Sequence, residues 1–208
     1  MRPLKEEIAS ATIQGCAAVA SAVGLVYLVT KALPRQDALE LGALIAYGAS
    51  MFIAFLVSAL YHAVQHPRTR SVLQRIDHCT IFLLIAGTYT PVALLPLRHH
   101  DGVALLASIW TLAIAGIVVR LCYVPLFQRI AIPLYLFMGW LALGWSVPLY
   151  ENTGTLPILL MIAGAISYTA GLLFYRWHLR PFSNSMWHLC VVAGGAWFFV
   201  AITHLQPM

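Results

Sequence analysis

The sequence predicts an all-α integral membrane protein, in which seven transmembrane helices form a single bundle over residues 1–208. The first observation is composition: 61% of the residues are hydrophobic and only 9% are charged, whereas about a quarter of a typical soluble domain is charged. The second is that the apolar residues form runs close to the roughly 20 residues that a helix needs to cross a bilayer. The third is that these runs show no alternation of polar and apolar residues, which excludes a transmembrane β-barrel.

Seven apolar runs, separated by charged residues, prolines and polar clusters, are expected to form the spans. They cover residues 11–31, 40–62, 78–97, 103–121, 130–149, 157–175 and 186–205. Lys31, Asp77 and Arg98 mark boundaries of the first three runs, while Arg129 precedes the fifth run and Arg176 follows the sixth. The segments between the runs are too short to fold alone, so one domain is expected.

Lysine and arginine residues are distributed unequally between the two ends of the predicted bundle. Nine lie in the N-terminal segment and in the second, fourth and sixth loops, and three lie in the first and third loops. Because cytoplasmic loops carry the excess of basic residues, the N-terminus is predicted in the cytoplasm and the C-terminus outside. The expected location is the cell inner (plasma) membrane, as a multi-pass protein.

The formal net charge of +5 comes from basic residues that lie between apolar runs and do not form one basic face. Nucleic-acid binding is therefore not expected, and membrane lipids are the predicted partners. Arg68, Arg70 and Arg75 of the second loop are expected to meet anionic headgroups. The sequence leaves the oligomeric state open.

Polar side chains gather at the predicted cytoplasmic ends of three spans, where polar groups are costly and point to function. Ser58 and His62 are four residues apart at the end of the second span, which puts them on one helical face. Asp77 opens the third span from the same side. His188 lies in the first turn of the seventh span, with Asn184 four residues before it. These five side chains are thus expected at one membrane depth.

Two imidazoles, a carboxylate and an amide at a common depth suit a zinc ion, which in catalytic sites takes three protein ligands and a water. Asp77 can orient or deprotonate that water, and Ser58 can bond the water or a developing oxyanion. His66 and His78 are possible substitute ligands. The alternative is that the same groups hydrogen-bond one another across helices and hold the bundle together without a metal.

The chain resembles the hemolysin III branch of the progestin and adipoQ receptor superfamily. The resemblance extends from the first segment to the last, and the third of the motifs that carry it is the most specific. The motifs are EEIA at residues 6–9, SALYH at 58–62, DHCTIFLLIAGTYTP at 77–91 and MWH at 186–188.

This resemblance implies a seven-helix bundle with an intramembrane zinc site near the cytoplasm. By resemblance, His62 and His188 match two zinc ligands, one ending the second helix and one from an H-x-x-x-H motif in the seventh. Asp77 matches the acid that holds the zinc-bound water, and Ser58 matches a nearby serine.

Two positions depart from the family pattern. Asn184 stands where H-x-x-x-H has its first histidine, and Gln14 stands where a histidine often follows the N-terminal glutamates. An amide oxygen is a weaker zinc ligand than imidazole, so the change at Asn184 is expected to weaken zinc binding. His62, His188 and Asn184 are nevertheless the predicted metal ligands.

The resemblance further implies zinc-dependent hydrolysis of a lipid amide or ester. In that hypothesis zinc-bound water is the nucleophile, Asp77 is its base and Ser58 contacts the water or oxyanion. The alternative is a non-enzymatic membrane-homeostasis or receptor-like protein with a structural or sensory site. A cytolytic pore is a third hypothesis, disfavoured because no predicted span offers a continuous polar stripe to line a channel.

Overall fold

The computed structural model describes residues 3–176 and 181–205, which are helical with short connections and contain no strand. Within these residues, seven helical segments are long and apolar enough to cross a membrane. The prediction of an all-α bundle with seven spans is therefore confirmed. The elements are α1 (Leu4–Ala32), η1 (Leu33–Arg35), α2 (Ala38–Ala63), α3 (Pro67–Leu94), α4 (Gly102–Cys122), α5 (Val124–Trp140), η2 (Leu141–Trp145), α6 (Ser146–Thr153), α7 (Thr155–Arg176) and α8 (Ser183–Thr203).

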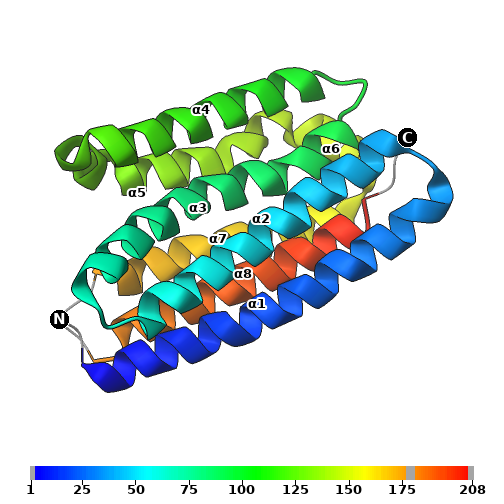
Figure 1. Cartoon of the computed structure of the whole chain (residues 1–208). Coiled ribbons are helices and arrows are strands. Elements are labelled where there is room, and N and C mark those ends of the chain that lie inside the picture. Colours follow the sequence, from blue (N-terminus) through cyan, green and yellow to red (C-terminus); the bar gives the residue numbers. More distant parts are fainter. Residues whose placement is uncertain (1–2, 177–180, 206–208) are drawn as a thin grey trace.

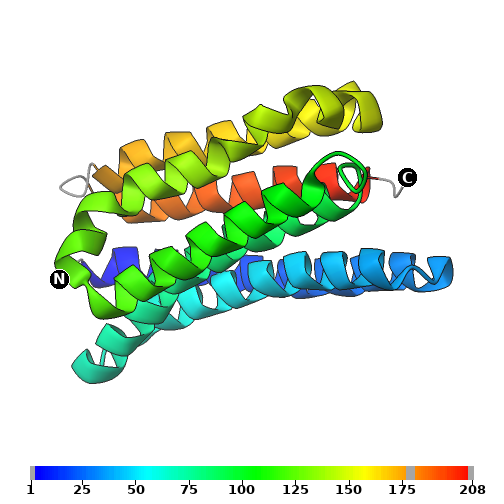
Figure 2. The same ribbon diagram turned by 90° about the horizontal axis from the view of Figure 1, so that it is seen from above.

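The spans run side by side along one axis, and helices that follow one another in the chain pack together (Figure 1, Figure 2). Contacts between α1 and α8 close the circuit, and α3 also contacts α5 and α8. This position makes α3 the most buried of the spans. The N- and C-terminal ends lie at opposite ends of the bundle (Figure 1). The charge count predicts which end faces the cytoplasm, and this stays a prediction. Two residues of that count, Arg2 and Arg180, lie outside the described residues.

Helix α3 begins at Pro67, eleven residues before the expected span, so the predicted second loop is wrong over most of its length. Proline suits the first position of a helix because an N–H at that position has no acceptor within the helix, so its absence costs nothing. The His66 side chain accepts a hydrogen bond from the Thr69 backbone N–H and caps the helix. Asp77 consequently lies about 15 Å along α3, in its third turn, and not at its start.

The fifth span is interrupted, which the apolar run did not predict. The α5 helix gives way to the 3-10 segment η2 before α6. Pro148 has no N–H to donate to the carbonyl of Gly144, so the end of η2 lacks one bond of a regular helix. The Tyr89 hydroxyl of α3 accepts from the Ala142 N–H at 2.9 Å and donates to the Gly139 carbonyl at 3.3 Å. The Tyr89 hydroxyl thus replaces helical hydrogen bonds that these backbone groups lose at the interruption. Inside a membrane, backbone groups must find such partners within the protein.

Replacing Gly87 tests the close approach of α2 and α3. A Cβ atom at Gly87 would collide with the Ser50 side chain and press on the Ala46 carbonyl. We expect Gly87→Ala to destabilise the protein by about 1–3 kcal/mol through overpacking, measured as a lower melting temperature of the helical signal in detergent. The control is Gly42→Ala in α2, where a Cβ meets nothing within 4 Å. Equal melting temperatures for the two variants would contradict the packing described here.

Candidate functional site

A pair of buried histidines lies where the end of α2 meets the start of α8. His62 and His188 are 2% and 5% exposed, and their Nε2 atoms are 2.9 Å apart. The side-chain amide nitrogen of Asn184 lies 3.5 Å from His62 Nε2. Asn184 lies inside the first turn of α8, so its separation of four residues from His188 puts both on one face.

Helix α1 contributes a carboxylate that fixes the first histidine. Glu7 Oε2 accepts a hydrogen bond from His62 Nδ1 at 2.7 Å, and Glu7 Oε1 accepts one from Arg70 at 2.7 Å. Because His62 uses its Nδ1 proton for Glu7, the neutral ring presents a lone pair at Nε2. Arg70 was expected to meet lipid headgroups, and its position is a correction: it binds Glu7 and donates to the Val64 carbonyl at 3.2 Å.

Gln14 of α1 holds the second histidine. Its amide Nε2 lies 2.6 Å from His188 Nδ1, while its buried Oε1 has no hydrogen-bond partner. A separation of 2.6 Å is short for a bond between two nitrogens and closer to the N–H···O range. Turning the amide by half a rotation lets Oε1 accept the His188 Nδ1 proton. That arrangement satisfies the orphaned oxygen and leaves a lone pair on His188 Nε2.

With both Nδ1 atoms donating, the two histidines direct lone pairs toward one another across 2.9 Å. Lone pairs at that distance repel, and either a proton on one of the two nitrogens or a metal ion bound to both removes the repulsion. No cluster of three His, Cys, Asp or Glu side chains suited to a metal occurs among residues 3–176 and 181–205. The two imidazoles are the donors that these residues offer to a metal. The Asn184 amide turns its nitrogen toward both His62 and Ser10, so its oxygen could join them only after a half rotation that gives up the donation to Ser10.

Four of the five predicted site residues line one cavity of about 120 Å³. These are His62, Asp77, Asn184 and His188. Ser58 is buried and lies behind Asp77, where its hydroxyl is within hydrogen-bonding reach of the carboxylate. The acid and the histidine pair thus face a common space, although Asp77 lies within α3 and not at its first residue.

The two proposed substitute ligands differ in position. His66 is exposed and bonds Thr69 at the start of α3, outside the cavity. His78 lines the cavity, but its Nδ1 accepts a hydrogen bond from Arg120 Nε at 3.0 Å. That bond directs the His78 Nδ1 lone pair toward α4.

The sequence reasoning missed the polar face of α1. The Asn184 backbone N–H donates to Glu6 Oε1 at 3.0 Å, and its side-chain amide donates to Ser10 Oγ at 3.1 Å. The signal was present, because polar residues recur at helical spacing along the first segment and would share one face. The buried polar residues of α1 are Glu6, Glu7, Ser10, Gln14 and Ser21.

Fold and site together define an integral membrane protein with a buried histidine pair at one end of a seven-helix bundle. The sequence profile described as "Haemolysin-III related" matches residues 3–199, and the chain belongs to this family. It is 41% identical to Hemolysin-3 of Bacillus cereus over 98% of this chain and 94% of that protein. It is 37% identical to the Hemolysin-3 homolog of Bacillus subtilis (strain 168) over 97% and 95%.

A more distant relative supports the superfamily relationship. The human monocyte to macrophage differentiation factor is 27% identical over 75% of this chain and 67% of its own length. The resemblance that the motifs indicated is therefore confirmed at the level of the family.

Replacing Glu7 tests whether α1 is joined to α2 and α3 through this carboxylate. We expect Glu7→Gln to lower stability by about 1–3 kcal/mol, since His62 and Arg70 lose a charged acceptor while Arg70 stays partly solvated. Thermal melting in detergent measures the loss. Lys5→Gln, an exposed change one turn from the protein's N-terminal end, is the control. Unchanged melting of Glu7→Gln would show that the bridge is dispensable.

Proposed function

We propose that this hemolysin III family protein is a zinc-dependent hydrolase of amide or ester bonds in membrane lipids. Its site would lie at the cytoplasmic end of the bundle, in the cell inner (plasma) membrane. The observation that carries the proposal is the shared space of the histidine pair and the Asp77 carboxyl. That space adjoins an apolar cavity suited to a hydrocarbon chain.

His62 and His188 are the proposed zinc ligands through Nε2, with the Asn184 amide oxygen as a third donor. Zinc, when bound, acts as a Lewis acid and lowers the pKa of a coordinated water to about 7. Two features support this role for the histidines. Glu7 accepts the His62 Nδ1 proton, and Gln14 has a spare oxygen for the His188 Nδ1 proton. Acceptors at the far nitrogen orient ligating histidines and raise their basicity.

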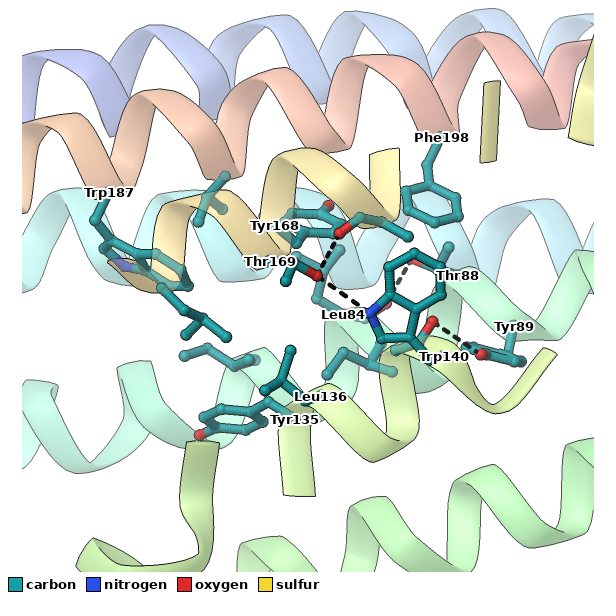
Figure 3. Close-up of a pocket in the computed structure, with 16 residues that line it drawn as sticks. Leu84, Thr88, Tyr89, Tyr135, Leu136, Trp140, Tyr168, Thr169, Trp187 and Phe198 are labelled. Carbon is teal, nitrogen blue, oxygen red and sulfur yellow. Dashed lines mark hydrogen bonds between the residues drawn. The ribbon is translucent and has the colours of Figure 1, made fainter. Parts of the chain in front are cut away.

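The apolar cavity has a volume of about 110 Å³ and lies between α3, α5, α7 and α8 (Figure 3). Trp140 Nε1 of its wall donates to Thr169 Oγ1 at 3.1 Å (Figure 3), whereas the buried Tyr168 hydroxyl makes no hydrogen bond found among the described residues. An apolar chain is the ligand that such a wall favours. Four residues line both this cavity and the histidine cavity, so the two are neighbours. The shared residues are Ile81, Tyr135, Leu172 and Trp187.

Asp77 is the proposed proton acceptor for the attacking water. Its half-buried carboxylate lines the cavity, and the Ser58 hydroxyl behind it can hold the carboxylate in one orientation. A chain in the apolar cavity places its polar bond near this group, which is the positioning that general-base catalysis needs.

A non-enzymatic structural or sensory role is the second candidate. It is favoured by the bonds that run from Arg70 through Glu7, His62 and His188 to Gln14. If Gln14 donates to His188 Nδ1, a proton on His188 Nε2 can be donated to His62, and the chain of bonds needs no metal. This candidate expects no zinc and no turnover.

Zinc content separates the two candidates. We expect the purified protein to carry near-stoichiometric zinc and His188→Ala to lose it, because the variant removes one of two imidazole donors. Elemental analysis of protein matched for helical content measures this. The control is His99→Ala, in the exposed segment before α4, which should retain zinc. Absence of zinc from the native chain would refute the metal proposal.

Loss of the Asp77 base tests the chemistry. We expect Asp77→Asn to lower kcat by about 10²–10⁴-fold, the usual contribution of a general base, while zinc content is retained. Release of fatty acid from a panel of N-acyl and O-acyl lipids in micelles measures turnover. Asp101→Asn, exposed before α4, is the charge-matched control. Turnover equal to the native rate in Asp77→Asn would eliminate the proposed mechanism.

A further inference from the structure

A second polar cavity, of about 420 Å³, lies between α3, α4 and α5, with Tyr175 of α7 also in its wall, next to the histidine cavity. The volume falls within the range of small-molecule sites. Its lining contains two arginines and no aspartate or glutamate among the described residues. The polar lining residues are Ser71, Gln74, Arg75, His78, Arg120, Gln128 and Tyr175.

Arg120 is the feature that needs explanation. Its side chain belongs to a membrane-spanning helix and is 6% exposed, yet none of the ion pairs found among the described residues includes it. Arg120 lies in the last turn of α4. A buried guanidinium without a carboxylate is costly in a protein interior, so a ligand that supplies negative charge would offset that cost.

The arginine is held in place by neutral contacts. Arg120 Nε donates to His78 Nδ1 at 3.0 Å, and the guanidinium carbon lies 5.1 Å from the centre of the Phe127 ring. The same Phe127 ring stacks on His78. These contacts use one face and one nitrogen of the guanidinium. Its terminal nitrogens make no hydrogen bond found among the described side chains, and the residue lines the cavity.

The remaining groups complement an oxyanion with several acceptor atoms. Arg75 supplies a second positive charge from α3, and the Gln128 amide and the Ser71 hydroxyl can donate hydrogen bonds. The Gln74 amide donates one proton to the Tyr61 hydroxyl at 3.2 Å and has a second proton to donate. A planar guanidinium whose position is already fixed recognises phosphate in two-point geometry. A phosphate offers more acceptor oxygens, in a tetrahedral arrangement, than the two coplanar oxygens of a carboxylate, so it can reach donors from several helices.

We propose that this basic cavity binds a phosphate group, with Arg120 as the fixed anchor and Arg75 as the second cation. The phosphate can come from a lipid headgroup or from free inorganic phosphate, which present the same oxygens. The site requires neither zinc nor hydrolysis, so it stands independently of the proposed function. Gln74 and His78 line both polar cavities, which makes the phosphate site a neighbour of the histidine pair.

The test is a calorimetric binding measurement on the full chain in non-ionic micelles at fixed ionic strength. The probes are short-chain phosphatidic acid and inorganic phosphate. We expect saturable binding to the native protein and a roughly 10- to 100-fold weaker Kd in Arg120→Gln, the effect of losing hydrogen bonds to a charged group. Arg75→Gln should weaken binding several-fold. Arg129→Gln, an exposed basic residue of the same segment that does not line the cavity, should change Kd less than twofold.

The two probes distinguish the sources of the phosphate. Tighter binding of phosphatidic acid indicates a lipid headgroup, and equal binding indicates free phosphate; both outcomes support the site. Equal Kd values for the native protein, Arg75→Gln and Arg129→Gln would overturn it, as would no binding of either probe. Arg75 is exposed, so its variant keeps the test decisive even if Arg120→Gln fails to fold.

Discussion

The Glu7 carboxylate is the contact on which the arrangement of the site depends. It accepts hydrogen bonds from His62 at the end of α2 and from Arg70 near the start of α3. One buried group of α1 thereby joins three helices and fixes the tautomer of a histidine. Because a charged carboxylate inside a bundle needs such partners, the position of α1 and the orientation of His62 are set together.

The same demand for internal partners explains the irregular fifth span. The backbone leaves the α-helical pattern after Trp140, and Tyr89 of α3 supplies hydrogen bonds at the interruption. The break lies beside the apolar cavity, whose wall includes both Tyr89 and Gly139. An irregular backbone at membrane depth is tolerated where protein surrounds it. Here α3, the most buried span, provides that surrounding.

Hydropathy and charge predicted the spans well, because both signals report whether a segment is surrounded by lipid or by water. They missed the polar first turns of α3, which are helical without being apolar, and so placed Asp77 at a helix start. The common depth of His62 and His188 followed from the alternation of helix direction. The roles of Glu7 and Gln14 did not follow, because they depend on α1 packing against both α2 and α8. The helical spacing of the polar residues indicates that they share one face of α1, but which helices that face packs against is a property of the tertiary structure.

The three cavities are arranged in a way that suits an amphiphile. The histidine cavity shares walls with the apolar cavity through Trp187 and with the basic cavity through His78. A lipid whose chain occupies the apolar cavity and whose phosphate occupies the basic cavity would extend past the histidine pair and Asp77. The linkage between chain and headgroup would then lie nearest the proposed base. Two independent proposals, one for the chain and one for the phosphate, thus converge on the same orientation of a ligand.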